Sequence, residues 1–223
     1  MSIYKKILGG IKVFKKIKFS VLYYWDRRQG AMFDKRYGVD TKNIVDVVFG
    51  DGPFDLALDK YSEGYAPISI REFRSVMSSL PFNLRDHVFV DLGSGYGRAM
   101  MYAASYQFQK IIGVEYVEIF NKKAVENTNT YSKVSGLKIS FQHLCIDVTK
   151  FKWPLQETVV FMYNPFCGEI LDRVLESMHH SLLEEPRSFW VLYCNAKHHE
   201  AFDNVKFLTC VVKYANFRIY KFV

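Results

Sequence analysis

The stretch Val88-Phe89-Val90-Asp91-Leu92-Gly93-Ser94-Gly95-Tyr96-Gly97-Arg98 decides the fold of this chain. An apolar run that ends in three alternating glycines is typical of a buried strand that turns abruptly into a helix. Glycine adopts positive φ without strain and lets the backbone lie close to a ligand. The stretch therefore predicts a strand, a ligand-binding turn and a helix in direct succession.

Strand-like and helix-like segments alternate on both sides of this turn. Apolar runs typical of strands occur at His87–Val90, Lys110–Val114, Leu137–Leu144, Thr158–Tyr163, Phe189–Cys194, Phe207–Lys213 and Phe217–Phe222. The pattern predicts helices at about 69–80, 96–106, 117–133, 168–183 and 196–202. The alternation favours a parallel sheet with right-handed crossovers, and the short turn between the last two runs indicates an antiparallel hairpin. We expect an α/β fold: a Rossmann-like three-layer sandwich whose mostly parallel seven-stranded sheet ends in that hairpin, with an N-terminal helical extension.

Acidic residues follow two further predicted strands. Glu115 ends the strand after the glycine turn, where a carboxylate can accept both hydroxyls of a ribose. Asp147 follows the third strand, where a carboxylate can accept from the amino group of an adenine. For either acid alone, a solvated strand end is the favoured interpretation. Because ligands of open α/β sheets bind at the carboxyl ends of the strands, we expect one adenosyl site there, built from Asp91, Gly93, Ser94, Gly95, Gly97, Glu115 and Asp147.

A nicotinamide dinucleotide is the competing ligand for this site. Its fingerprint G-x-G-x-x-G requires Gly or Ala at the third position, where this chain has Arg98. Asp91, two residues before the first glycine, suits the ammonium of a methionine group better than a pyrophosphate. Charge therefore favours S-adenosyl-L-methionine (SAM), with an NAD-dependent oxidoreductase as the alternative.

The motif Asp91–Gly97 resembles the first motif of class I SAM-dependent methyltransferases. The chain is similar to a group of small, mostly bacterial members with no assigned substrate, and the resemblance covers about residues 33–200. It rests also on Phe33–Thr41, Tyr65–Pro67, Gly113–Glu115 and Tyr163–Phe166. It implies a methyltransferase that uses SAM and releases S-adenosyl-L-homocysteine. Tyr65 and Pro67 are either a lid over the cofactor or a simple linker.

A second motif, Tyr163-Asn164-Pro165-Phe166, ends the fourth predicted strand and is similar to the Asn-Pro-Pro-Tyr motif of methyltransferases. The resemblance implies three catalytic residues: Asn164 and the Pro165 carbonyl accept hydrogen bonds from a target nitrogen, and Phe166 packs on it. We also expect Asn164 to contact the cofactor. An ordinary strand-ending turn is the alternative. Because Cys167 stands after a single proline, the acceptor of the two-proline enzymes does not carry over.

These motifs together predict a SAM-dependent methyltransferase whose acceptor is unidentified. The methyl group would pass to a nitrogen or oxygen of a protein side chain, or of a lipid or saccharide precursor. A SAM-binding module without catalysis is the alternative from another functional class.

Positive charge is concentrated at the N-terminus. The net charge is +7, and residues 1–40 account for all of it. Residues 3–25 have the periodicity of a basic amphipathic helix, so we expect a basic helical extension and linker at 1–60 and a methyltransferase domain at 61–223. Residues 1–40 would contact an anionic membrane or an acidic partner, or cover a core or subunit interface. Nucleic acid is less favoured, because the rest of the chain carries no net positive charge.

Four scattered cysteines and six histidines show no metal-ligand spacing, so we predict no metal site. No run approaches the roughly 20 apolar residues of a membrane span, which excludes a transmembrane protein at this stage. We expect a cytoplasmic protein with reduced thiols, which would be peripheral at the membrane if residues 1–40 contact it.

Overall fold

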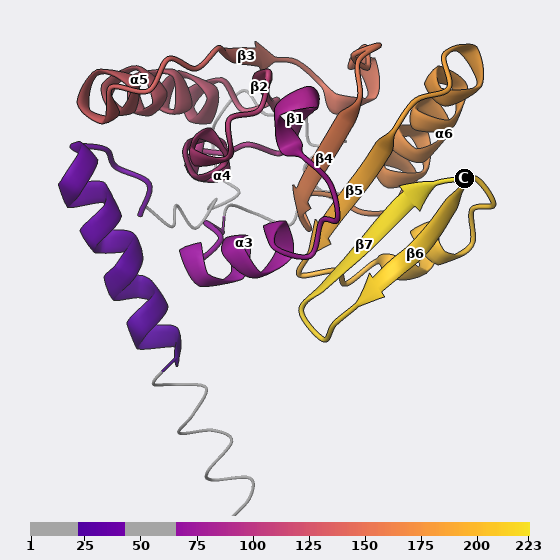
Figure 1. Ribbon diagram of the computed structural model, residues 1–223, viewed down its shortest axis with the longest axis horizontal. Coiled ribbons are helices and arrows are strands. Elements are labelled where there is room, and N and C mark those ends of the chain that lie inside the picture. The colour runs from indigo at the N-terminus through magenta and orange to yellow at the C-terminus, as the bar shows by residue number, and fades with distance from the viewer. Residues whose placement is uncertain (1–21, 43–65) are drawn as a thin grey trace, which may run out of the picture.

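A computed structural model describes residues 22–42 and 66–223 of the chain. Its centre is a seven-stranded sheet of order β3-β2-β1-β4-β5-β7-β6 (Figure 1). Strands β1 to β5 are parallel, and β7 pairs antiparallel with both β5 and β6. The strands are β1 Val88–Leu92, β2 Lys110–Glu115, β3 Phe141–Cys145, β4 Thr158–Tyr163, β5 Phe189–Cys194, β6 Leu208–Lys213 and β7 Phe217–Phe222. The predicted fold class is confirmed.

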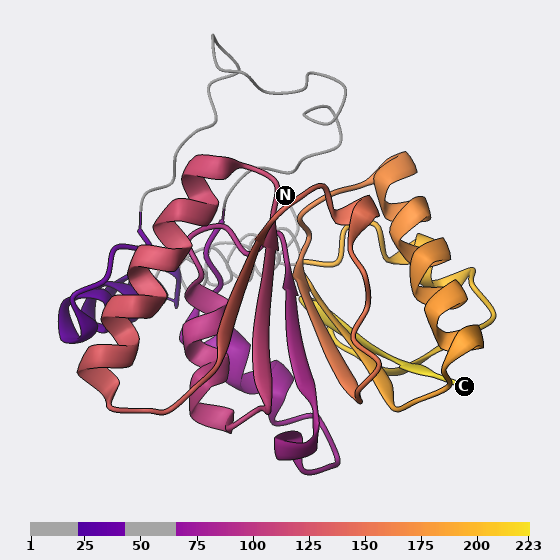
Figure 2. The ribbon, with the colours of Figure 1, turned by 90° about the horizontal axis from the view of Figure 1, so that it is seen from above.

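Helices cover both faces of the sheet (Figure 2). A helix over residues 22–37, with α3 Ile70–Met77, α4 Arg98–Ala103 and α5 Glu118–Ser135, lies on one face. The other face carries η3 Val148–Lys150, α6 Gly168–Glu184 and α7 His199–Asp203. Two short 3-10 turns, η1 Leu84–Asp86 and η2 Ala104–Tyr106, complete the connections. Within the described residues, no helix is long and apolar enough to cross a bilayer.

Alternation along the strands creates two cores. In β1, Val88, Val90 and Leu92 point toward the α6 face, and Phe89 points toward the α4 face. Asp91 shares the side of Phe89 and replaces an apolar side chain at the carboxyl end of that core. The pleat of the strand therefore aims one carboxylate into the space beside the glycine turn.

Several element boundaries differ from the sequence expectation. The predicted strand at Leu137–Leu144 begins only at Phe141, because Gly136 ends α5 in a left-handed conformation and a link follows. The predicted helix at 96–106 begins at Arg98, after the last positive-φ glycine. Residues 26–37 were not predicted as helix, yet the described helix runs from 22 to 37. Asp34 near its C-terminal end looks like a surface residue in the sequence but is buried.

This N-terminal helix is attached to the domain through a buried ion pair. Asp34 and Arg98 are 3% and 7% exposed, and the Arg98 Nη2 lies 3.5 Å from the Asp34 Oδ2. Thr41 donates its hydroxyl to Asp34 at 2.7 Å and accepts the Arg98 Nε–H at 2.6 Å. Gly30 leaves room for the guanidinium, because a Cβ there would lie 3.0 Å from the Arg98 Nη1.

Aromatic packing adds to this attachment. The Phe33 ring lies 4.8 Å from the rings of Tyr37 and Tyr102, and Tyr37 lies 4.7 Å from Tyr131 of α5. Residues 30–41 thus pack directly on α4 and α5. The expected domain boundary at residue 60 stays a prediction, since residues 43–65 lie outside the described part of the chain.

Candidate active site

The glycine turn after β1 is fixed by backbone hydrogen bonds to β2. Gly93, Gly95 and Gly97 have φ values of 73°, 52° and 78°, a region that only glycine enters without strain. The N–H groups of Gly93 and Ser94 both donate to the Val114 carbonyl, at 2.9 and 3.1 Å. The turn is therefore held against the end of the neighbouring strand.

Gly93 also allows the turn after β1 to touch the turn after β4. A Cβ on Gly93 would lie 2.4 Å from the Cβ of Pro165, which is shorter than any real contact. Because β1 and β4 are neighbours in the sheet, their carboxyl ends meet at this point. The expected cofactor turn and the expected reaction turn are thus in direct contact.

Glu115 fastens the glycine turn from the end of β2. Its Oε2 accepts the Gly95 N–H at 2.8 Å and its Oε1 accepts the Val117 N–H at 3.0 Å. Burial raises the pKa of this carboxyl, and the backbone N–H groups act in the opposite direction. The Tyr116 N–H also acts on this carboxylate, and because a carboxylate has about four lone-pair sites, Glu115 can still accept from a ligand.

Asp91 is the most perturbed acid of the site. It is 2% exposed, and its Oδ2 has no hydrogen-bond partner among the described residues. Burial, with a smaller contribution from the charge of Glu115, raises the pKa of Asp91 to about 8. A buried carboxyl without a partner is costly to the fold, which makes it a candidate for ligand binding.

Two more polar atoms are buried without a partner in this region. One is the Ser94 Oγ, which would lie 2.9 Å from a Cβ on Gly113, the residue paired with Asp91 across β1 and β2. The other is the Asn164 Nδ2, in the turn after β4. Native proteins satisfy most such groups. Together with Asp91, they fit a polar ligand that brings both hydrogen-bond donors and acceptors.

The reaction turn holds Asn164 in a strained conformation. Asn164 has a φ of 48° and is 1% exposed. The hydroxyl of Tyr193, on β5, donates to its side-chain oxygen at 2.6 Å and accepts the His198 N–H at 3.3 Å. This arrangement turns the Asn164 oxygen toward β5 and leaves the amide Nδ2 as the unpartnered group.

Comparison with known proteins decides the family. Residues 61–179, more than half of the chain, match the family described as histone methylation protein DOT1. The chain belongs to this methyltransferase family. The site at the turns after β1 and β4 therefore belongs to a DOT1-family protein. The methyl donor that this family implies is SAM.

Solved structures show the same fold at low identity. A predicted N6-adenine-specific DNA methylase from Listeria monocytogenes has a TM-score of 0.51 at 16% identity, over 72% of this chain and 52% of its own. A candidate methylase from Haemophilus influenzae has a TM-score of 0.50 at 17% identity, over 72% of this chain and 93% of its own. This DOT1-family chain therefore spans about half the length of the Listeria protein. No curated protein sequence matches the chain.

The remaining predicted site residues lie in different surroundings. The Asp147 Oδ1 accepts from the N–H and the hydroxyl of Thr149, both at 2.9 Å, so this acid caps η3. Phe166 is 6% exposed and packs in the core with Ile170, so its ring is covered in this conformation. Tyr65 lies outside the described residues.

Sequence reasoning missed two residues that organise this DOT1-family site. Tyr193 sits in an apolar strand run, where nothing indicates what its hydroxyl binds. Asn127 of α5 donates to the carbonyls of Tyr96 and Asp40, at 3.0 and 2.8 Å, and so joins the glycine turn to the N-terminal segment. Its position in a polar helix gave no signal of burial.

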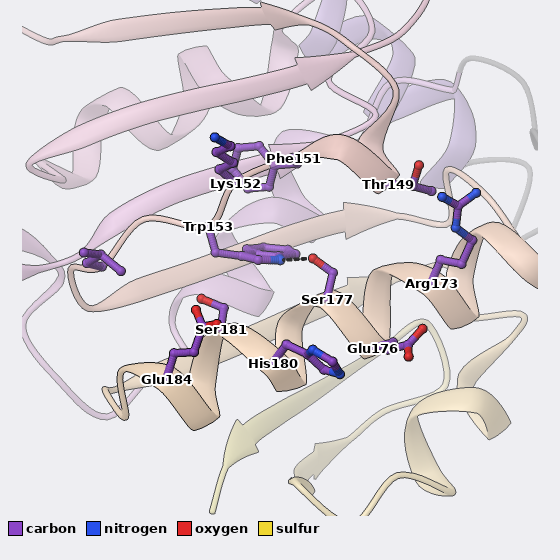
Figure 3. Close-up of a pocket in the computed structure, with 11 residues that line it drawn as sticks. Thr149, Phe151, Lys152, Trp153, Arg173, Glu176, Ser177, His180, Ser181 and Glu184 are labelled. Carbon is purple, nitrogen blue, oxygen red and sulfur yellow. Dashed lines mark hydrogen bonds between the residues drawn. The ribbon is translucent and has the colours of Figure 1, made fainter.

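A separate groove lies on the face of the sheet that α6 covers, between α6 and the segment after η3 (Figure 3). It encloses about 550 Å³, and side chains of both charges line it: Arg173, Lys152, Glu176 and Glu184. The Trp153 Nε1–H donates to the Ser177 Oγ at 2.8 Å across it. None of the candidate site residues lines this groove. Within residues 22–42 and 66–223, no group of acidic, His and Cys side chains is arranged to hold a metal.

Proposed function

We propose that this chain is an active SAM-dependent methyltransferase that binds its methyl donor where the turns after β1 and β4 meet. One observation carries the proposal: the buried atoms Asp91 Oδ2, Ser94 Oγ and Asn164 Nδ2 have no partner in the described structure, beside a glycine turn. Membership of a methylation family supports the same conclusion.

Each residue has a role that its position supports. Asp91 releases its proton when the ammonium of the methionine group binds and then pairs with that charge, because a nearby cation lowers the raised pKa of a carboxyl. Glu115 offers its remaining accepting capacity to the ribose hydroxyls. Gly93, Ser94, Gly95 and Gly97 allow close approach of the backbone. In this proposal Asp147 accepts from the adenine amino group, and Tyr65 closes over the cofactor.

Asn164, Pro165 and Phe166 form the acceptor side of the proposed site. SAM supplies an already activated methyl group, so the protein needs to orient the nucleophile and exclude water. Because Tyr193 occupies one lone pair of the Asn164 oxygen, Asn164 approaches the acceptor with its remaining lone pair and its free amide hydrogens. Phe166 would have to leave the core to pack on the acceptor.

Calorimetric titration of the full chain with SAM and with S-adenosyl-L-homocysteine tests the proposal. We expect binding of both ligands in the micromolar range common for enzymes. If neither ligand produces heat or a thermal shift, the proposal fails. Binding without any transfer to an acceptor would instead indicate a SAM-binding module.

The acceptor is proposed as a nitrogen or oxygen of a protein side chain, or of a lipid or saccharide precursor. The DOT1 family description names histone methylation, and the Listeria protein is described as a DNA methylase, so the known relatives differ in acceptor class. Labelled methyl transfer into a fractionated cell lysate separates protein, nucleic-acid, lipid and small-molecule acceptors in one experiment.

We expect Asp91→Asn to stabilise the free protein in a pH-dependent way. The raised pKa means that folded Asp91 keeps a proton that the unfolded chain releases, so wild-type stability falls as pH rises from about 3.8 to about 8. Asparagine has no such proton, so the melting-temperature advantage of the variant should grow across this interval. Calorimetric titration should show weaker SAM binding. A constant advantage at all pH values would contradict the raised pKa.

We expect Tyr193→Phe to reduce methyl transfer while leaving SAM affinity nearly unchanged. The variant frees the Asn164 amide to rotate, and the lost hydrogen bond costs about 1 kcal/mol of stability. Tyr220→Phe is the matched control, because its buried hydroxyl binds Asp203 instead. Labelled transfer into lysate is the measurement. Equal loss in both variants would show a general effect of stability and exclude a positioning role for Tyr193.

A further inference from the structure

The helix over residues 22–37 has two unlike faces. Its inner face, with Gly30, Phe33 and Asp34, packs on the domain. Its outer face carries Tyr24 and Met32, which are 72% and 55% exposed, and Trp25, which is 45% exposed. Figure 1 shows this helix at the flank of the molecule, away from the sheet. A large apolar and aromatic surface therefore lacks a partner within the described residues.

Ion pairs at both ends of the helix prevent this outer face from turning inward. Arg71 of α3 binds Asp26 through two hydrogen bonds, at 3.1 and 2.7 Å. Asp34 is held in the buried contact with Arg98. Because rotation of the helix would break both contacts, the outward direction of Tyr24, Trp25 and Met32 is fixed.

The sequence before residue 22 contains apolar residues at helical spacing. These apolar residues follow one another at spacings of three and four: Ile3, Ile7, Ile11, Phe14, Ile17 and Val21. Trp25 lies four residues after Val21, and Met32 lies seven residues after Trp25, so the same helical period extends to both. Residues 1–21 lie outside the described part of the chain. As a sequence pattern, these positions share the period of Trp25 and Met32 and not that of Phe33 and Asp34.

Charge around these apolar residues indicates what kind of surface binds there. Residues 1–42 contain eleven Lys and Arg against three Asp, a net charge of +8, which leaves −1 for the rest of the chain. Arg28 and Lys35 are exposed on the outer face itself. A second copy of this helix would bring two sets of like charges together, which disfavours self-association through it.

We propose that this outer face binds the surface of an anionic phospholipid bilayer. Tyr and Trp prefer the boundary between lipid headgroups and acyl chains, and flanking Lys and Arg are attracted to anionic headgroups. The apolar side chains of the outer face match the acyl chains of that boundary, and the neighbouring cations match its anionic headgroups. A nucleic acid would bind the cations alone and leave the apolar side chains in water. The inference does not depend on the proposed methyl transfer.

Sedimentation of the full chain with lipid vesicles tests the proposal. We expect binding to vesicles of phosphatidylglycerol mixed with phosphatidylcholine, and much weaker binding to phosphatidylcholine alone. Raising the salt concentration should weaken the binding, because the attraction between surface charges is screened.

Two variants test whether vesicle binding depends on this face or on exposed apolar side chains in general. Replacing Tyr24, Trp25 and Met32 together by serine should lower vesicle binding by roughly tenfold or more, because this apolar area no longer leaves water. Replacing Val134, Leu155 and Leu183 by serine removes as many exposed apolar side chains elsewhere and should change nothing. Circular dichroism and SAM titration should be unchanged in both, which keeps this test apart from that of the proposed function.

Three results would overturn the proposal. The first is equal sedimentation of the outer-face variant and the wild type. The second is equal binding to anionic and neutral vesicles. The third is binding to duplex DNA or RNA, or dimerisation that the outer-face variant abolishes, without binding to vesicles.

Discussion

Replacing Gly93 by alanine is expected to abolish SAM binding and to lower the stability of the domain. The new Cβ would lie 2.4 Å from the Cβ of Pro165, and the φ of 73° is strained for any residue with a side chain. The conformational strain costs about 1 kcal/mol, and forcing an extra carbon into a packed contact costs about 1–3 kcal/mol more. Since the proline ring cannot rotate away, we expect the two turns to separate.

Gly136→Ala is the matched control for this variant. Gly136 has nearly the same φ, 69°, but a Cβ there would meet no atom within 4 Å. The Gly136→Ala variant should therefore carry the strain of a positive φ but no steric clash of the new Cβ, and its SAM affinity should be retained. Thermal denaturation and calorimetric titration of both variants make the comparison. If Gly93→Ala bound SAM as Gly136→Ala does, the two turns would not need the observed contact.

Asp34→Ala is expected to destabilise the protein by about 3–5 kcal/mol. Removal of one member of a buried ion pair leaves the other charge uncompensated, and here Arg98 would lose Asp34 at a site where both are almost fully buried. Thr41 would lose its bonds to the same carboxylate. Denaturant unfolding measures the change in free energy.

Asp26→Ala provides the control for an exposed ion pair. Asp26 binds Arg71 with good geometry, but the Arg71 side chain is 47% exposed, so the loss should stay within about 1 kcal/mol. The double variant Asp34→Ala with Arg98→Met should recover part of the stability, because no buried charge is left unpaired. Equal losses for Asp34→Ala and Asp26→Ala would contradict a buried, structural role for the Asp34–Arg98 pair.

The order of strands and helices could be predicted from the sequence because it depends on local patterns. The runs Thr158–Tyr163, Phe189–Cys194 and Phe217–Phe222 are strands with the predicted bounds. The glycine turn with Asp91 and Glu115 was also predictable, since parallel strands bring their carboxyl ends to one edge. These patterns determined the fold class and the methyltransferase family.

Only the tertiary structure decided how the site is built. The contacts of Gly93 with Pro165, of Tyr193 with Asn164 and of Arg98 with Asp34 join residues far apart in the chain, through the sheet register and helix packing. Arg98 departs from the dinucleotide fingerprint in the sequence, yet in the fold it is half of the ion pair that attaches the N-terminal helix. A local pattern specifies which face of an element is apolar, but the partner of a buried polar group depends on what the folded chain brings opposite it.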